Sequence, residues 1–220
     1  MQHRKKPVCI YVDNSNIYIG GQEAAKNRQE DSMQFRINFS HFLYLVTGGD
    51  LEFEELVWAG SGPHDIEDIF ESMTKRGIDL HIIPRSETGE HETVDEAIQL
   101  CMYRHHRKYR NSPGTIVLCT GDGKGYHEEK GFLYDVTGFI EDGWDLALYS
   151  WDANCHHQLK DFAIKHGHYV KLEDHYESIT FIKSGRNAKP VELHPARKQR
   201  KPAAQRSKGL ATGGSNKPAM

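Results

Sequence analysis

The 220-residue sequence lacks any uninterrupted apolar run of about 18 residues, so no segment predicts a membrane-spanning helix. Its four cysteines are scattered and form no Cys-x-x-Cys pair, which is typical of reduced thiols in a cytoplasmic protein rather than of a disulfide framework. A strand-like segment, and not a signal-peptide core, follows the basic start of the chain. We therefore expect a cytoplasmic protein that has no membrane partner.

Acidic residues are scarce only at the end of the chain. After Ile182 there are ten basic residues and one acid, Glu192, a net charge of +9, whereas the remaining body holds 18 basic and 30 acidic residues, a net charge of −12. Large apolar residues also become rare from Ser184 onward. The composition therefore predicts a folded domain over residues 7–182 and a disordered basic tail over residues 183–220. The tail either binds polyanions or only aids solubility.

Short strand-like segments alternate with amphipathic segments along the expected domain. Strands are expected at residues 8–12, 55–59, 79–84, 115–119, 144–151 and 168–172. Helices are expected at residues 39–47, 65–76, 93–106, 132–141 and 155–165. Residues 17–38 are polar and irregular, and predict either a helix or a lid. The alternation is typical of a three-layer α/β domain with a mostly parallel central sheet.

Two aspartates directly follow two of the expected strands. Asp13 opens the segment Asp13-Asn14-Ser15-Asn16, and Asp122 lies within Thr120-Gly121-Asp122-Gly123. Because ligands of open α/β sheets bind beyond the carboxyl ends of the strands, both carboxylates are expected at the binding edge. There the Thr120 hydroxyl would bond to Asp13 or to a phosphate. An ordinary turn is the alternative at each position, since both segments are rich in turn-forming residues.

A third carboxylate, Asp95, is expected at the same edge. It lies in Thr93-Val94-Asp95-Glu96, where a helix begins soon after a strand has ended. The alternatives are that this acid only stabilises the helix dipole, or that Glu96 takes its place. Three clustered carboxylates would form an oxygen-rich site for Mg²⁺ or Mn²⁺.

Together these motifs resemble the NYN domain, a PIN-like nuclease family that includes the LabA-like proteins. The matching segments are Val12–Asn16, Val94–Ile98 and Thr120–Gly123, which occur in family order and span most of residues 7–176. The resemblance implies a PIN-like, Rossmann-like fold and a metal-dependent endoribonuclease, a hydrolase of RNA phosphodiester bonds.

The resemblance also implies roles for individual residues. The expected ligands of a catalytic Mg²⁺ or Mn²⁺ ion are Asp13, Asp95 and Asp122. The polar groups expected to shape the site are Asn16 and Thr120. Apart from the resemblance, the residues expected to contact the substrate are Lys124, Asn14 and Ser15. The implied partner is single-stranded or structured RNA, and a homodimer is compatible with the sequence.

Two positions depart from the family pattern. Lys124 stands where a second acid often follows two residues after Asp122, and Cys101 stands where the helix often carries a further acid. The missing carboxylate could come from Glu128, Glu129 or Asp152. The open alternative is a catalytically weak or inactive NYN-type module that binds RNA or protein.

Three other readings have less support. A nucleic-acid-binding patch at the basic run Arg104–Arg110 is one of them. The run lies at a helix end, where cations are favourable without any ligand. Zinc is not expected at Cys155-His156-His157, because adjacent histidines on a helix point apart and no second ligand pair is evident. An aspartyl-phosphate phosphatase is not expected, because the first strand ends in Asp-Asn-Ser and not in Asp-x-Asp.

Overall fold

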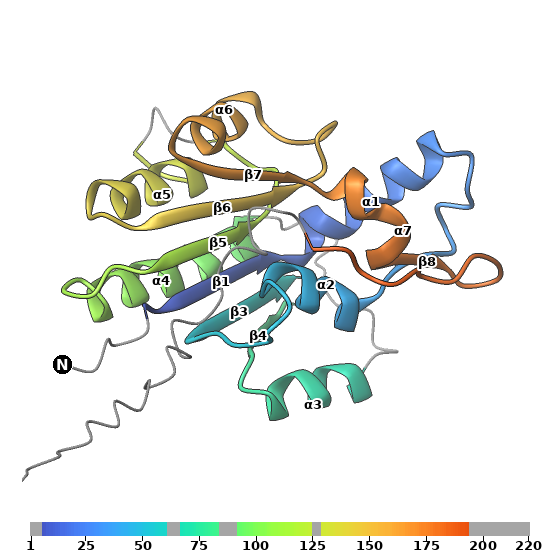
Figure 1. The fold of residues 1–220 in the computed structure, drawn as a ribbon, viewed down its shortest axis with the longest axis horizontal. Coiled ribbons are helices and arrows are strands. Elements are labelled where there is room, and N and C mark those ends of the chain that lie inside the picture. The colour runs from blue at the N-terminus through green and yellow to red at the C-terminus, as the bar shows by residue number, and fades with distance from the viewer. Residues whose placement is uncertain (1–5, 61–66, 84–91, 125–128, 194–220) are drawn as a thin grey trace, which may run out of the picture.

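A six-stranded parallel sheet forms the centre of the protein (Figure 1). The computed structural model describes residues 6–60, 67–83, 92–124 and 129–193. Along the sheet, the strands are β4 Asp79–Ile82, β3 Glu55–Gly60, β1 Val8–Asp13, β5 Thr115–Cys119, β6 Asp145–Ser150 and β7 Gly167–Lys171. Every neighbouring pair is parallel, which confirms the expected α/β class.

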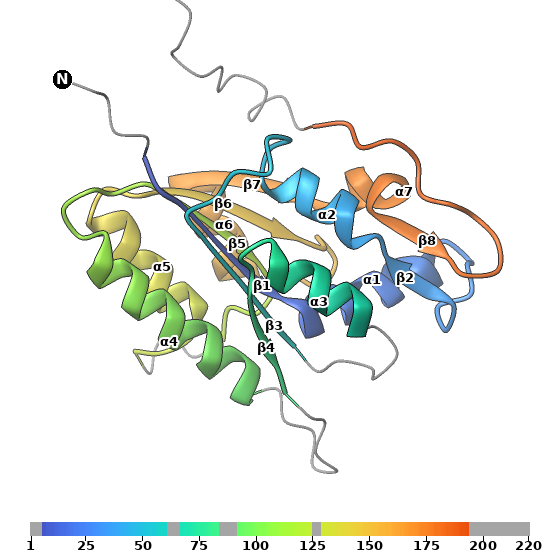
Figure 2. The same ribbon diagram turned by 90° about the horizontal axis from the view of Figure 1, so that it is seen from below.

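Helices cover both faces of this sheet, so the domain has three layers (Figure 2). One face is covered by α4 Glu92–Lys108, α5 Phe132–Glu141 and α6 His157–His166. The other face is covered by α1 Asn14–Asn27, α2 Phe39–Val46, α3 Glu67–Lys75 and α7 Tyr176–Ile179, the last preceded by a 3₁₀ turn at Leu172–His175. A separate antiparallel ribbon pairs β2 Phe35–Ile37 with β8 Thr180–Ile182.

The central strand β1 is rich in apolar residues up to Val12 because both of its faces are buried. Ile10 and Val12 pack into the core beneath α1 and α2, whereas Cys9 and Tyr11 pack into the core beneath α4 and α5. A strand that is covered on both faces reads as a continuous apolar run and not as an alternating one. This burial explains why the sequence signal for β1 is strong.

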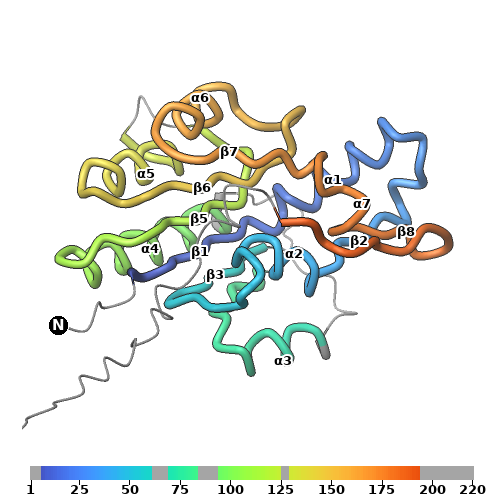
Figure 3. Tube along the Cα trace, viewed as in Figure 1, coloured from blue at the N-terminus to red at the C-terminus, as the bar shows by residue number. Residues whose placement is uncertain are grey.

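The strand order creates a switch point between β1 and β5. From β1 the chain continues to β3 and β4 on one side, and then crosses to β5, β6 and β7 on the other. Figure 3 shows β1 lying between β3 and β5. In open α/β sheets, the crevice beyond the carboxyl ends of the strands at such a point is the usual ligand site. Asp13 ends β1, and Thr120 follows the end of β5.

Residues 17–38, which the sequence left open between helix and lid, contain most of α1 and all of β2. Two glycines, Gly20 and Gly21, lie inside α1, although glycine disfavours a helix interior. A Cβ at Gly20 would lie 2.5 Å from Cδ1 of Trp151, and one at Gly21 would overlap the Phe35 ring. Trp151 also donates from Nε1 to the carbonyl of Ile17 at 2.7 Å. The glycines therefore allow a close approach of α1 to the indole.

The folded chain continues beyond the expected boundary at residue 182. Arg186 donates to Glu30 at 2.9 Å and to the carbonyl of Thr180 at 2.8 Å. The hydrogen bond from Arg186 lowers the pKa of the Glu30 carboxyl. Pro190 accepts a hydrogen bond from the Ser178 hydroxyl. Residues 194–220, the rest of the expected tail, lie outside the described residues.

None of the helices that the structure describes is both long and apolar enough to cross a membrane. In the part of the chain that the structure describes, no disulfide joins any of the four cysteines.

Candidate functional site

Asp13 is buried at the switch point and is held at both carboxylate oxygens. Its side chain caps α1, because Oδ1 accepts the backbone N–H of Asn16 at 3.0 Å. Its Oδ2 accepts the hydroxyl of Thr120 at 2.9 Å. Asp13 therefore has a local role at the start of α1, and it is also one of the two partners expected for the Thr120 hydroxyl.

A chain of hydrogen bonds joins the ends of β1 and β5. Asn16 Oδ1 accepts the backbone N–H of Gly121 at 2.7 Å. The buried Thr120 hydroxyl also accepts the N–H of Asp122 at 3.2 Å. Asp122 Oδ1 accepts the N–H of Lys124 at 2.9 Å. The two motifs thus form one connected polar unit, in which Asp122 is half-buried and Lys124 is exposed.

Asn14 contributes a buried oxygen beside Asp13. Its Oδ1 has no hydrogen-bond partner among the described residues. The side chain lies against Gly60 at the end of β3, where an added Cβ would be 2.8 Å from Asn14 Cβ. Leaving a buried acceptor unsatisfied costs about 1–3 kcal/mol. An oxygen in this state suits a ligand that donates a hydrogen bond or coordinates oxygen.

Asp95 lies in the first turn of α4, which follows β4 and packs against β1 and β3. Its side chain is half-buried. The three aspartates do not form a compact group of metal ligands. In the described part of the chain, a different set of three side chains has ligand atoms that all lie within 4.8 Å of one another. They are Asp79, His81 and Cys101, a candidate metal-binding cluster. The predicted carboxylates therefore approach the same edge without closing into a compact set.

Asp152, a candidate for the missing carboxylate, is part of a structural ion-pair group. It binds the ammonium groups of Lys160 at 2.6 Å and Lys171 at 3.0 Å, and it accepts the hydroxyl of Tyr169 at 2.9 Å. The Lys160 contact is the main reason that the pKa of Asp152 falls to about 2. Of the other candidates, Glu129 is exposed and Glu128 lies outside the described residues.

His156, to which the sequence assigned no role in the site, borders the Asp122 loop. Its backbone N–H donates to the carbonyl of Gly121 at 2.8 Å. Its Nδ1 is buried without a partner among the described residues and lies 3.0 Å from where a Cβ of Gly123 would be. The available signal was only positional, because His156 follows β6 and so reaches the same sheet edge as Asp122.

Thr120→Val tests whether the hydroxyl holds the two motifs together. The change keeps the side-chain shape but removes the donor to Asp13 and the acceptor for the Asp122 N–H. We expect the free energy of unfolding to fall by about 1–3 kcal/mol, because buried polar groups lose their partners. Urea denaturation of Thr120→Val beside Thr120→Ser measures this. A loss of stability in Thr120→Ser with no loss in Thr120→Val would show that methyl packing, and not the hydroxyl, matters.

Asp135 is a second residue that the sequence did not single out. It lies in the first turn of α5, and its Oδ2 is buried without a partner among the described residues. Burial raises the pKa of this carboxyl to about 7. The folded protein therefore binds this proton more tightly than the unfolded chain does. Stability consequently falls as the pH rises from about 4 to about 7.

Asp135→Asn should remove that penalty. We expect a gain of about 1–3 kcal/mol in the free energy of unfolding at pH 8, because a buried unpaired charge is replaced by a neutral group. The gain should shrink as the pH approaches 4. Urea denaturation at pH 8 and pH 5 measures it, with exposed Asp161→Asn in α6 as the control. A loss of stability at pH 8 would contradict the prediction.

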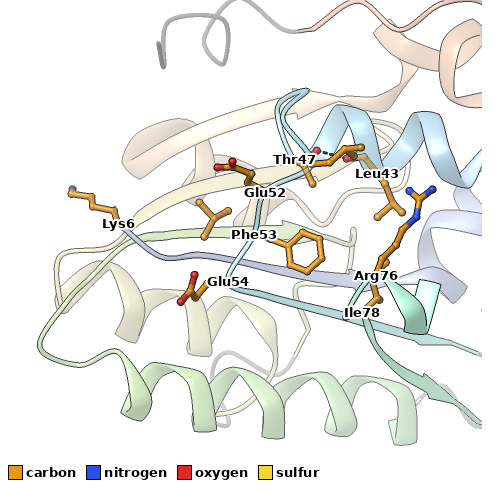
Figure 4. Close-up of a pocket in the computed structure, with 10 residues that line it drawn as sticks. Lys6, Leu43, Thr47, Glu52, Phe53, Glu54, Arg76 and Ile78 are labelled. Carbon is orange, nitrogen blue, oxygen red and sulfur yellow. Dashed lines mark hydrogen bonds between the residues drawn. The ribbon is translucent and has the colours of Figure 1, made fainter. Parts of the chain in front are cut away.

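A separate hollow of about 700 Å³ lies at the opposite, amino-terminal ends of the strands. Phe53 lies within it, and Lys6 and Arg76 lie on opposite sides of that ring (Figure 4). Its other charged residues are Glu52 and Glu54. None of the predicted site residues lines this hollow, so it is not the site that the motifs indicate.

Comparisons with known proteins give information on the fold but not on the function. No family model matches the chain, and no curated protein matches it. The fold is similar to the crystal structure of a protein of unknown function from Vibrio parahaemolyticus, with a TM-score of 0.57 and 16% sequence identity over 79% of this chain and 97% of that chain. At this identity, the similarity supports the three-layer α/β fold alone.

Proposed function

We propose that the protein is a metal-dependent endoribonuclease of the NYN type, with its site at the carboxyl ends of β1 and β5. The observation that carries this proposal is the hydrogen-bonded unit in which Asp13, Thr120 and Asp122 meet at the switch point. If Asp13 were only a turn residue at the end of β1, it would not need a buried hydrogen bond to Thr120 at the end of β5. The unit supports a site that is built from both motifs together.

The donor set fits a hard divalent cation. Asp13, Asp95 and Asp122 offer carboxylate oxygens, and Asn14 offers the buried carbonyl oxygen that has no described partner. Mg²⁺ and Mn²⁺ prefer such oxygen ligands. When bound, the metal would activate water and neutralise charge on the phosphodiester.

The surrounding residues have complementary roles in this proposal. Asn16 and the Thr120 hydroxyl fix the orientation of the Asp13 carboxylate, because both bond to it directly. Exposed Lys124, next to the Asp122 loop, would contact a substrate phosphate, and Ser15 would do so from the start of α1. The basic residues after Ile182 would attract the RNA backbone in a salt-dependent way.

A catalytically inactive RNA-binding module is the second candidate. Both Asp13 oxygens already accept hydrogen bonds, and the three aspartates do not converge within 4.8 Å. Lys124 and Cys101 also replace acids that the related family often has. This candidate predicts RNA binding that is independent of divalent metal.

Cleavage of end-labelled single-stranded and hairpin RNA tests the proposal. The wild-type protein is incubated with Mn²⁺, with Mg²⁺ and with EDTA, and DNA of the same sequence and a small aryl phosphate serve as comparison substrates. We expect internal cleavage of RNA with metal and none with EDTA. RNA binding without cleavage under every metal condition would favour the binding module, and turnover of the aryl phosphate alone would favour a small-molecule phosphatase.

A further inference from the structure

Three unlike metal ligands converge where the edge strand β4 meets α4. Asp79 and His81 are two residues apart on β4, so their side chains lie on the same face of the strand. Cys101 is buried on α4, which covers that face of the sheet. One ligand atom from each residue lies within 4.8 Å of the other two.

The two separations that involve His81 are close to those around a tetrahedral zinc ion. His81 Nε2 lies 3.6 Å from Cys101 Sγ and 3.1 Å from Asp79 Oδ2. Zinc bonds of roughly 2.3 Å to sulfur and roughly 2.0 Å to nitrogen or oxygen, at tetrahedral angles, separate sulfur from nitrogen by about 3.6 Å and nitrogen from oxygen by about 3.3 Å. The side chains would therefore need little movement to hold one ion.

The contacts do not have the arrangement of a cysteine–histidine–aspartate catalytic triad. In a triad, the nucleophile and the acid bond to opposite nitrogens of the imidazole ring. Here the thiol and the carboxylate both approach the same nitrogen, Nε2 of His81. Cys101 is also only 4% exposed, so it could not readily attack a substrate. A shared centre between the three atoms explains the convergence better than a proton relay does.

We propose that Asp79, His81 and Cys101 bind a Zn²⁺ ion that links the edge strand β4 to α4. A thiolate and a carboxylate balance the two charges of the ion, so no net charge is left at the buried end of the site. Sulfur and imidazole ligands favour zinc over Mg²⁺ or Mn²⁺, which distinguishes this site from the oxygen-rich one. The binding site does not depend on whether the protein cleaves RNA.

The ion can reach the site from solvent. The surroundings also keep a fourth coordination position open for water. The side chain of Asp79 is 60% exposed and that of His81 is 32% exposed. His105, one helical turn after Cys101, is engaged elsewhere, because its Nδ1 lies 3.0 Å from the Tyr11 hydroxyl and its Nε2 faces Glu55. Three protein ligands with an accessible fourth position are typical of exchangeable or reactive zinc sites rather than of closed structural ones.

The site is a neighbour of the proposed nuclease site and yet separate from it. The strand register pairs Asp13 with Ala59, and Ala59 with His81. His81 is thus level with Asp13 but two strands away, about 10 Å at the usual strand spacing. Metal titrations must therefore tell the two sites apart.

Cobalt titration makes that distinction, because a thiolate ligand gives Co²⁺ a charge-transfer band that oxygen ligands do not give. The full-length protein, without a polyhistidine tag and stripped with EDTA, is titrated with CoCl₂ and then with ZnSO₄. We expect the thiolate band to saturate at one equivalent of Co²⁺ and to disappear when Zn²⁺ displaces it. We also expect Zn²⁺ to raise the melting temperature.

Variants assign the ligands. Cys101→Ser should abolish the band, and His81→Gln should weaken Co²⁺ binding by at least about tenfold. Cys155→Ser, which changes a half-buried cysteine outside the cluster, should leave the band unchanged. Circular dichroism checks that each variant is folded, and His81→Gln provides the test if Cys101→Ser does not fold. No thiolate band in the wild type, or a band that survives Cys101→Ser or is unchanged in His81→Gln, would overturn the proposal.

Discussion

Asp13→Asn should reduce metal-dependent RNA cleavage on the order of 100-fold or more, the scale seen when a single charge-stabilising group is removed from an active site. Asparagine keeps the size of the side chain and can still cap α1, because its carbonyl oxygen can accept the N–H of Asn16. The Thr120 hydroxyl can rotate to accept from the new amide. The change therefore removes the negative charge that would bind metal while the local fold is maintained.

The measurement is the initial rate of internal RNA cleavage at saturating Mn²⁺. The matched control is Asp161→Asn, which makes the same chemical change at an exposed position of α6. Melting temperatures show whether both variants remain folded. A folded Asp13→Asn protein that cuts at the wild-type rate would exclude Asp13 as a metal ligand.

Gly114→Ala should destabilise the protein by about 3 kcal/mol, because a well-packed position without free space tolerates no added methyl group. Gly114 directly precedes β5, and an added Cβ would overlap the carbonyl of Pro7, just before β1. That same carbonyl accepts the N–H of Thr115 at 2.8 Å. The clash is with backbone, so relief requires β1, which ends in Asp13, and β5, which leads to Asp122, to move apart.

The control for this change is Gly138→Ala in α5. A Cβ there would lie 3.8 Å from Cε1 of His106, an ordinary contact, and alanine favours a helix interior by about 0.5–1 kcal/mol over glycine. Urea denaturation should therefore show Gly114→Ala to be less stable than the wild type and Gly138→Ala to be equal or more stable. Similar stabilities for both variants would contradict the packing account of β1 and β5.

The sequence predicts the main elements well where the signal is local. The strand at residues 115–119 and the helix at residues 132–141 have the predicted bounds, because a continuous apolar run and a clear helical face mark them. The sequence leaves residues 17–38 open between a helix and a lid because they are polar and irregular. Part of what makes α1 irregular is explained only by the fold, since Gly20 makes room for the distant ring of Trp151. The short strands β2 and β8 were missed because each consists of three residues and depends on the other.

The candidate site also has parts that the sequence predicts and parts that it does not. The alternation of elements is enough to bring Asp13 and Thr120–Asp122 to one edge. Of the two partners expected for the Thr120 hydroxyl, Asp13 and a phosphate, the structure shows the bond to Asp13. The meeting of Cys101 with His81 could not be predicted, because it depends on how far α4 is rotated and shifted over β4. The burial of Asp135 depends in the same way on how neighbouring helices pack around α5.

The most direct test of the central claim is RNA cleavage in a Cys101→Ser background, where metal bound at the proposed zinc site cannot account for activity. Cys101→Ser and Cys101→Ser/Asp122→Asn proteins, both checked for folding, are compared on one labelled single-stranded RNA with Mn²⁺ and with EDTA. We predict Mn²⁺-dependent cleavage by the first protein and at least about a 100-fold slower rate for the second. Equal cleavage by both proteins, or no metal-dependent cleavage by the first, would contradict a nuclease site at the ends of β1 and β5.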